Sequence, residues 1–193
     1  MPGTFYYTLA AITFFGSNVC SWFALLTPKW LLFESPRPYR TTTNYGLFLK
    51  CSSLNVDPCR SFPSDDVYDD CSEDGFCEEW STAKTDMIFA CIIGGVTFFY
   101  LLYVLLIGGV SLKQIGWKYI SGAVFITSLL QISTVSFIAH LYNTSDRFYY
   151  GVKFDICFML ASSSAGLNFV LACILLYVGW FSLNNSSDYS ALE

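Results

Sequence analysis

Four long apolar stretches without a charged side chain divide the sequence, at residues 7–26, 87–109, 119–141 and 156–180. As a helix, each stretch would span about 30 Å or more, which matches the hydrocarbon core of a membrane. Their apolar residues do not alternate with polar ones, as they would in the strands of a membrane barrel. Over such a run in hydrocarbon, a helix satisfies its own backbone hydrogen bonds. The pattern therefore predicts four transmembrane helices.

The connections between these stretches carry most of the charge and indicate the orientation of the chain. The connections and the terminal tail are residues 27–86, 110–118, 142–155 and 181–193. Residues 110–118 contain two lysines and no acidic residue, whereas residues 29–84 contain ten acidic and six basic residues. Cytoplasmic connections of membrane proteins carry an excess of lysine and arginine. We therefore expect a single domain, residues 1–193, with both termini in the cytoplasm and the long first connection outside.

The long first connection also contains a strand pattern. Large apolar residues alternate at Tyr45, Leu47 and Leu49, as in a half-buried strand that ends at Cys51. Shorter strands are expected at 31–33 and 59–62. The predicted fold class is an all-α membrane protein with a small β-sheet at one end of its helices.

Composition supports the membrane assignment and argues against catalysis. Hydrophobic residues make up 54% of the chain and charged residues 13%, against about a quarter in soluble domains. The sequence has one histidine and no zinc-protease, redox-cysteine or phosphate-loop motif. We expect no enzyme activity, no cofactor, no metal site and no nucleic-acid partner, and we expect membrane lipid around the helices.

Four cysteines lie in the long first connection, and an even number in an extracellular segment predicts disulfides. They permit three pairings. We favour Cys51 with Cys59 and Cys71 with Cys77, because each bridge then closes a short local loop. A zinc site is disfavoured, because the spacings exceed those of zinc-binding cysteine pairs and the connection lacks histidine.

An acidic run follows, with eight carboxylates between residues 65 and 79 and no base among them. Three interpretations remain open: a solvated loop, a calcium loop that opens at Asp70 but has Ser81 where a glutamate is needed, and a docking surface for a basic partner. The carboxylates expected to contact such a partner are Asp65, Asp66, Asp69, Asp70, Glu73 and Asp74.

Two further features concern the second outer connection and the last helix. Asn143 opens an Asn-Thr-Ser sequence on the predicted outer side, so it is a candidate glycosylation site. Small residues fill positions 161–166, which allows close helix packing inside the bundle.

The spacing of an aromatic residue, a glycine and two cysteines resembles the signature of the claudin superfamily. Those residues are Trp30, Gly46, Leu47, Phe48, Cys51 and Cys59, with Phe48 at the place of the family's second tryptophan. The superfamily includes claudins, epithelial and peripheral myelin proteins, and the calcium-channel γ and stargazin-like receptor subunits. The resemblance implies a left-handed four-helix bundle topped by an extracellular antiparallel sheet, with a Cys51–Cys59 bridge.

Residues 62–70 resemble the acidic F-P-x-D-x-x-Y segment of the stargazin-like subunits. That resemblance implies a non-catalytic auxiliary subunit of an ion channel or ligand-gated receptor, of the glutamate-receptor type, which modulates gating or trafficking. Its partner would be a larger receptor subunit, bound through helix faces and the acidic segment at the plasma membrane, for example at synapses. The alternative is a claudin-like junction or adhesion protein, whose partners are like molecules.

Overall fold

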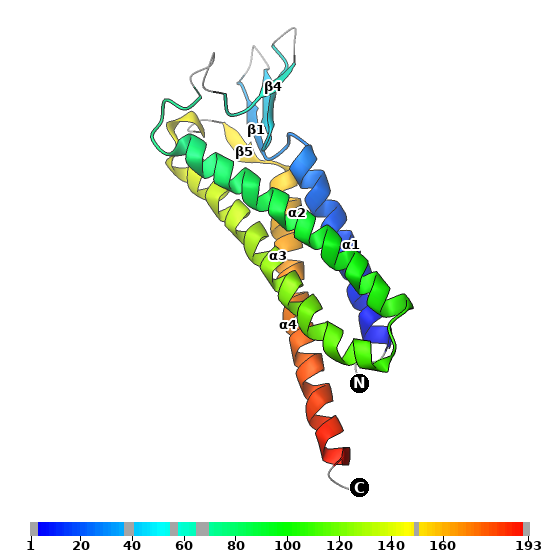
Figure 1. The fold of residues 1–193 in the computed structure, drawn as a ribbon. Coiled ribbons are helices and arrows are strands. Elements are labelled where there is room, and N and C mark those ends of the chain that lie inside the picture. The colour runs from blue at the N-terminus through cyan, green and yellow to red at the C-terminus, as the bar shows by residue number, and fades with distance from the viewer. Residues whose placement is uncertain (1–3, 37–40, 55–57, 65–69, 149–150, 191–193) are drawn as a thin grey trace.

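Four long helices and a small sheet make up the computed structural model, which describes the chain except residues 1–3, 37–40, 55–57, 65–69, 149–150 and 191–193. The helices are α1 (Thr4–Leu26), α2 (Phe76–Leu106), α3 (Val110–Thr144) and α4 (Ile156–Ser190). All four are long and apolar enough to cross a membrane, which indicates a multi-pass membrane protein. The bundle is elongated, with the sheet at one end (Figure 1).

The helices extend beyond the apolar stretches that predicted them. Helix α2 begins at Phe76, before the predicted start at 87, and its first turns include Glu78 and Glu79. At its other end α2 is shorter than predicted, because it ends at Leu106 and not at 109. Residues 110–118, expected to form a loop, are instead the first turns of α3, and α4 continues through most of the predicted tail. An uncharged stretch of sequence marks only the part of a helix that lies in hydrocarbon. The helix can continue into water, where charged and polar side chains are compatible with it.

The sheet has five antiparallel strands in the order β4-β3-β2-β1-β5. The strands are β1 (Leu31–Glu34), β2 (Thr42–Tyr45), β3 (Leu49–Ser52), β4 (Cys59–Ser61) and β5 (Val152–Phe154). Strand β5 comes from the second outer connection, after the short helix η1 (Asp146–Phe148), and was not predicted. It pairs with β1, so the two outer connections form one sheet.

The prediction of one strand through Tyr45, Leu47 and Leu49 was wrong. The chain turns between β2 and β3, and the backbone N–H of Gly46 donates to the carbonyl of Leu49 at 2.8 Å. A Cβ atom at Gly46 would lie 2.4 Å from Cα of Pro28. Glycine is therefore needed here because the end of α1 passes too close for a side chain.

Buried aromatic residues join the sheet to the helices. The indole N–H of Trp30 donates to the carbonyl of Ala24 at 2.7 Å, and its backbone N–H donates to Tyr45 at 2.8 Å. The indole of Trp80, on α2, donates to the carbonyl of Leu47 at 3.3 Å. Both tryptophan side chains are fully buried. These contacts fix the sheet on the ends of α1 and α2.

A polar cluster lies among the helices at mid-length. Ser17 and Ser164 join α1 to α4, with hydroxyl oxygens 2.7 Å apart. The side-chain amide of Gln131, on α3, donates to Ser21 at 2.6 Å and accepts from Asn168 at 2.9 Å. Ala161, Ser164 and Ala165 are buried, as expected for small residues that allow helices to approach.

Candidate partner-binding surface

Two disulfides restrain the end of the molecule that carries the sheet. Cys51 pairs with Cys59 between the neighbouring strands β3 and β4. Cys71 pairs with Cys77, which ties the segment before α2 to the first turn of that helix. This is the pairing that the short loops favoured. The bridge from Cys71 holds the middle of the acidic run against the first turn of α2.

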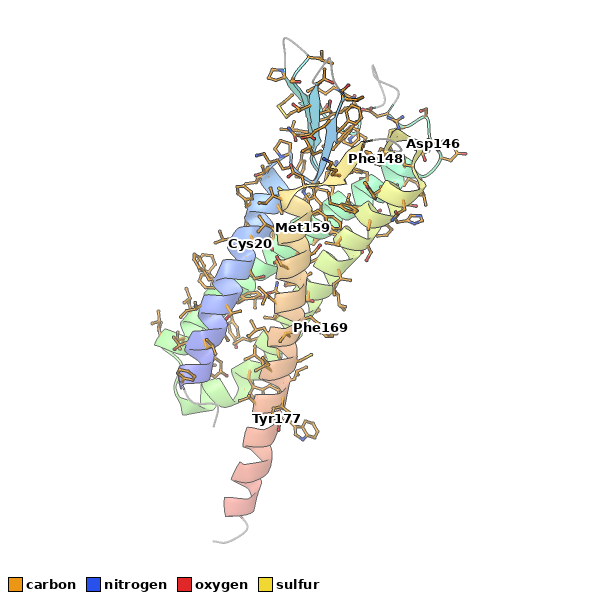
Figure 2. All side chains as sticks on the ribbon, turned by 180° about the vertical axis from the view of Figure 1, so that it is seen from behind. Cys20, Asp146, Phe148, Met159, Phe169 and Tyr177 are labelled. Carbon is orange, nitrogen blue, oxygen red and sulfur yellow. A yellow bond between two sulfur atoms is a disulfide. The ribbon has the colours of Figure 1, made fainter. Side chains whose placement is uncertain are left out.

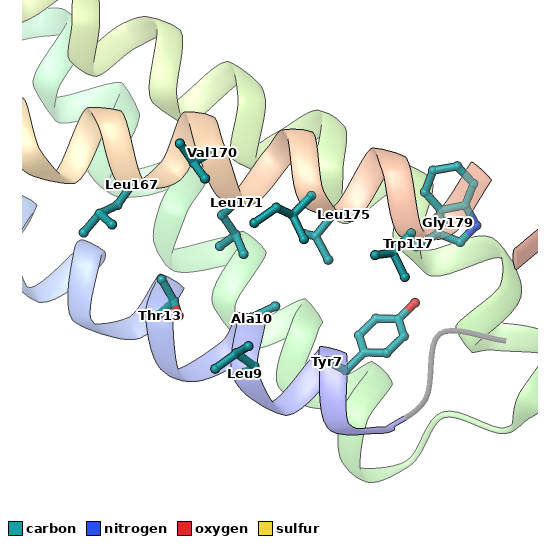
Figure 3. Close-up of a pocket in the computed structure, with 12 residues that line it drawn as sticks. Tyr7, Leu9, Ala10, Thr13, Trp117, Leu167, Val170, Leu171, Leu175 and Gly179 are labelled. Atoms are coloured by element: carbon teal, nitrogen blue, oxygen red, sulfur yellow. The ribbon is translucent and has the colours of Figure 1, made fainter. Parts of the chain in front are cut away.

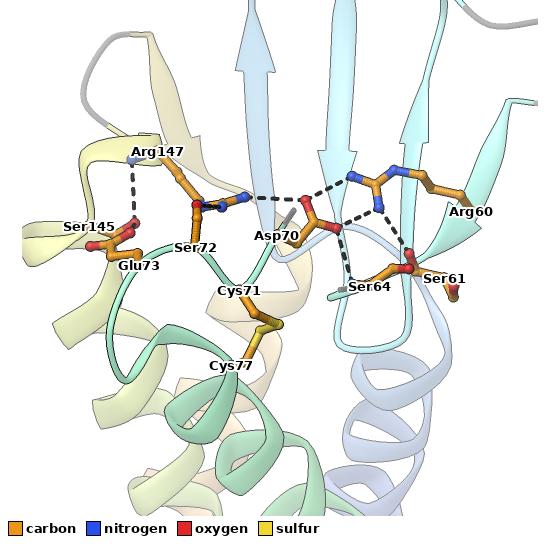
Figure 4. Close-up of polar contacts among 10 residues, drawn as sticks. All are labelled: Arg60, Ser61, Ser64, Asp70, Cys71, Ser72, Glu73, Cys77, Ser145 and Arg147. Atoms are coloured by element: carbon orange, nitrogen blue, oxygen red, sulfur yellow. Dashed lines mark hydrogen bonds and ion pairs between the residues drawn. A yellow bond between two sulfur atoms is a disulfide. The ribbon is translucent and has the colours of Figure 1, made fainter. Parts of the chain in front are cut away.

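Asp70 lies at the centre of a buried ionic contact (Figure 4). Arg60, on β4, donates to both of its carboxylate oxygens, at 2.5 Å and 2.9 Å. Arg147, on η1, donates at 3.2 Å, and the backbone N–H of Ser64 donates at 3.1 Å. The Asp70 side chain is only 3% exposed. The buried carboxylate of Asp70 therefore links β4, in the first connection, to η1, in the second.

The charge of Asp70 is stabilised by these donors. Burial opposes ionisation, but the hydrogen bonds from Arg60 and Ser64 and the charges of Arg60 and Lys50 together lower the pKa of Asp70 below its ordinary value. On the same sheet, burial and the neighbouring charge of Arg60 lower the pKa of Lys50, whose amino nitrogen lies 4.8 Å from the ring centre of Tyr45.

The expected contact between Asp70 and a partner is disfavoured, because the carboxylate is buried and already bound by two arginines. The same contacts argue against the calcium interpretation, in which Asp70 would be the first ligand. Within the described ranges, no group of three or more metal-ligating side chains is placed to hold an ion.

Further contacts fix the rest of the described acidic segment. The hydroxyl of Ser145 donates to Glu73 at 2.6 Å, and Arg147 donates to Ser72 at 3.0 Å. The Arg147 guanidinium also lies 5.3 Å from the ring centre of Phe76. Glu73 is half-buried, whereas Asp74 and Glu78 are exposed. Among the described carboxylates that were expected to contact a partner, Asp74 is therefore the exposed one.

Asp65, Asp66 and Asp69 lie outside the described residues. Sequence reasoning missed Arg60 and Arg147, which lie 10 and 77 residues from Asp70. The only signal for them was that both connections contain basic residues as well as acidic ones. A local window around residues 65–79 cannot detect such partners.

The remaining predicted residues lie close to the sheet. Gly46 and Leu47 are buried, whereas Phe48 is exposed and its ring centre lies 5.7 Å from the amino nitrogen of Lys84. Asn143 is exposed in the last turn of α3, where its side chain donates to the carbonyl of Ala139 at 2.7 Å. Its glycosylation stays a prediction.

No protein-family model matches the sequence, and no curated protein matches it either.

Proposed function

We propose that the protein is a non-catalytic auxiliary subunit of an ion channel or ligand-gated receptor, of the ionotropic glutamate-receptor type. In this proposal it lies in the plasma membrane with its sheet outside and both termini in the cytoplasm. It binds a larger channel subunit through helix faces in the bilayer and through the acidic segment outside, and it modulates gating or trafficking.

The observation that carries the proposal is the rigid attachment of the acidic segment. A disulfide, the Asp70 contact and the Ser145–Glu73 hydrogen bond hold residues 70–77 against the second outer connection. Asp74 and Glu78 remain exposed beside these restraints. A binding surface that is already ordered loses little conformational entropy when a partner binds. Exposed carboxylates on it attract and orient a basic surface.

Exposed apolar side chains on α4 support the membrane part of the proposal. Met159, Phe169 and Tyr177 lie on its outer side (Figure 2) and are 60%, 41% and 72% exposed. Such a face contacts either lipid or a neighbouring transmembrane helix. A receptor helix packed on α4 would therefore replace lipid without exposing polar groups of this chain.

The arrangement of the motif residues supports membership of the claudin superfamily as part of the proposal. Trp30 and Leu47 are buried where the sheet meets the helices, and the Cys51–Cys59 bridge joins two neighbouring strands. Of these features, the bridge within the sheet is the one that the resemblance implies. Within the superfamily, the stargazin-like branch has an acidic segment that residues 62–70 resemble, and the exposed carboxylates that the proposal uses follow directly after it.

Removal of exposed negative charge tests the proposal. The protein is isolated in mild detergent from membranes of its own cells, and bound proteins are identified by mass spectrometry at 50 and 300 mM salt. We expect a channel or receptor subunit, held less firmly at high salt because salt screens exposed charges. The double variant Asp74→Asn/Glu78→Gln should release it further.

The matched control is Glu34→Gln, which removes an exposed carboxylate from β1, outside the acidic segment. This variant should retain the partner. Recovery of no channel subunit, or equal recovery with the double variant and the wild type, would contradict the proposed docking.

A claudin-like adhesion protein is the second candidate, and exposed apolar residues of the sheet favour it. Phe48 and Leu49 are 38% and 39% exposed, and Leu54 is 71% exposed. Apolar side chains at the outer end of the molecule suit contact with a second copy. If cells that carry the protein adhere to one another, and Leu54→Ser abolishes the adhesion, the second candidate replaces the first.

A further inference from the structure

An apolar cavity of about 240 Å³ lies between α1 and α4, toward the end of the bundle that is distant from the sheet. Side chains of Ala10, Thr13 and Leu171 project into the space between the two helices (Figure 3). Every residue that lines it belongs to a segment apolar enough to span the membrane. The cavity therefore lies along the membrane-spanning parts of α1 and α4.

The cavity has a buried floor and an open mouth. Trp117, from α3, and Leu175 line it and are only 5% and 7% exposed. Leu9 and Val170 also line it, yet they are 53% and 54% exposed. Because these rim residues reach the outer surface of the bundle, the cavity opens between α1 and α4 toward lipid.

Gly179 allows the indole of Trp117 to close one end of the cavity. A Cβ atom at Gly179 would lie 2.3 Å from Cδ2 of Trp117, so a larger residue would displace the ring. At the same end, the exposed Lys118 places its amino nitrogen 5.8 Å from the ring centre of Trp117. A positive charge therefore stands at one end of an apolar cavity.

Exposed aromatic side chains place this end at the level of lipid headgroups. Tyr119 and Trp180 flank Trp117 and Gly179 in sequence and are 67% and 69% exposed. Tyrosine and tryptophan on membrane helices concentrate at the interface between hydrocarbon and water. Lys118 therefore lies where a lipid phosphate lies, and the cavity extends from there into the depth of the acyl chains.

We propose that the cavity between α1 and α4 binds one acyl chain of an anionic phospholipid, whose headgroup contacts Lys118. Apolar cavities of this kind exclude water, and one of about 150 Å³ is large enough to take up benzene. Since the mouth faces lipid, an acyl chain is the apolar group available to fill it. The charge of Lys118 selects an anionic headgroup over a zwitterionic one.

Quenching of Trp117 fluorescence by brominated lipid tests this proposal directly. The protein carries Trp22→Phe and Trp180→Phe, which remove the two exposed tryptophans, while Trp30 and Trp80 are fully buried. It is placed in phosphatidylcholine nanodiscs with increasing fractions of phosphatidylglycerol brominated on one acyl chain. We expect quenching that saturates at a low fraction of this lipid. Brominated phosphatidylcholine should quench only at higher fractions.

Two pairs of variants separate the cavity from the general lipid surface. Thr13→Phe fills the cavity and should remove the saturating phase, whereas Ile12→Phe adds the same ring at an exposed neighbouring position and should not. Lys118→Gln should raise the half-saturating fraction about fivefold, as expected for one lysine near an anionic surface. Lys84→Gln, near the sheet, should leave it unchanged.

Folding of each variant is checked by circular dichroism, and Val178→Phe serves as a second cavity-filling change if Thr13→Phe misfolds. Equal, non-saturating quenching by both brominated lipids would overturn the proposal. So would preferential quenching by a brominated sterol, or a dimer in which a second copy covers the cavity and prevents quenching.

Discussion

The substitution Asp70→Asn tests whether the buried ionic contact holds the outer connections together. Asparagine keeps the size of the side chain but removes its charge and replaces one acceptor oxygen with an NH₂ donor. That donor would face a guanidinium group, because Arg60 and Arg147 approach both carboxylate oxygens. At least one hydrogen bond is therefore lost, and two positive charges lose their shared counter-ion.

The size of the effect follows from how far the contact is buried. Removal of one partner from a fully buried ion pair costs about 3 to 5 kcal/mol. Here the Asp70 side chain is 3% exposed, but Arg60 and Arg147 are 18% and 26% exposed, so water solvates them in part. We therefore expect Asp70→Asn to reduce the free energy of unfolding of the outer end by about 2 to 3 kcal/mol.

The pH dependence has a definite sign. The donors around Asp70 hold its pKa below the ordinary value in the folded protein, so the ionised carboxylate favours folding. This contribution is complete above the unfolded pKa of about 3.9 and is lost as the pH falls through the folded pKa. The difference in stability between wild type and Asp70→Asn should therefore shrink in acid.

Hydrogen exchange of the detergent-solubilised protein measures the effect where it occurs. Backbone amides of β4 and of residues 70–77 should exchange faster in Asp70→Asn, while the transmembrane part of α3 should not change. Asp74→Asn is the matched control, since it removes an exposed carboxylate from the same segment. Equal exchange in the two variants would refute the reasoning, as would purely additive effects of Asp70→Asn and Arg147→Gln.

Three further substitutions test the fold by thermal or chemical unfolding. Gly46→Ala should cost about 1 to 3 kcal/mol, because the added Cβ overlaps backbone, whereas Gly95→Ala meets no neighbouring atom and should cost nothing. Serines in place of the Cys51–Cys59 bridge should cost about 2.5 kcal/mol through loop entropy. Gln131→Leu should cost about 1 kcal/mol, because it removes three side-chain hydrogen bonds between helices.

The helices could be predicted from sequence because the property that marks them is local. A run without charge long enough to cross a membrane needs no knowledge of its neighbours. Three of the four runs lie wholly within helices of the structure, and the run 87–109 passes the end of α2 by three residues. Their ends were harder to predict. The first turns of α2 contain Glu78 and Glu79, and a hydropathy criterion excludes such residues although the helix continues through them.

The sheet was only partly predictable, because register and strand ends depend on distant contacts. Alternation at Tyr45, Leu47 and Leu49 looked continuous, but Gly46 lies against Pro28 and the chain turns there. Strand β5 has only three residues and forms where the second outer connection meets β1. Neither fact has a signature within a short window of sequence.

The acidic segment shows how charge in a sequence differs from charge available to a partner. Within residues 65–79 every charged side chain is acidic, yet Asp70 is neutralised by two arginines and Glu73 accepts a hydrogen bond from Ser145. These contacts reduce the negative charge that faces outward, and they also order the segment that bears the rest. Under the proposed function, a surface held in this way would favour selective docking through a few carboxylates over general attraction to any basic molecule, because its remaining charges have fixed positions.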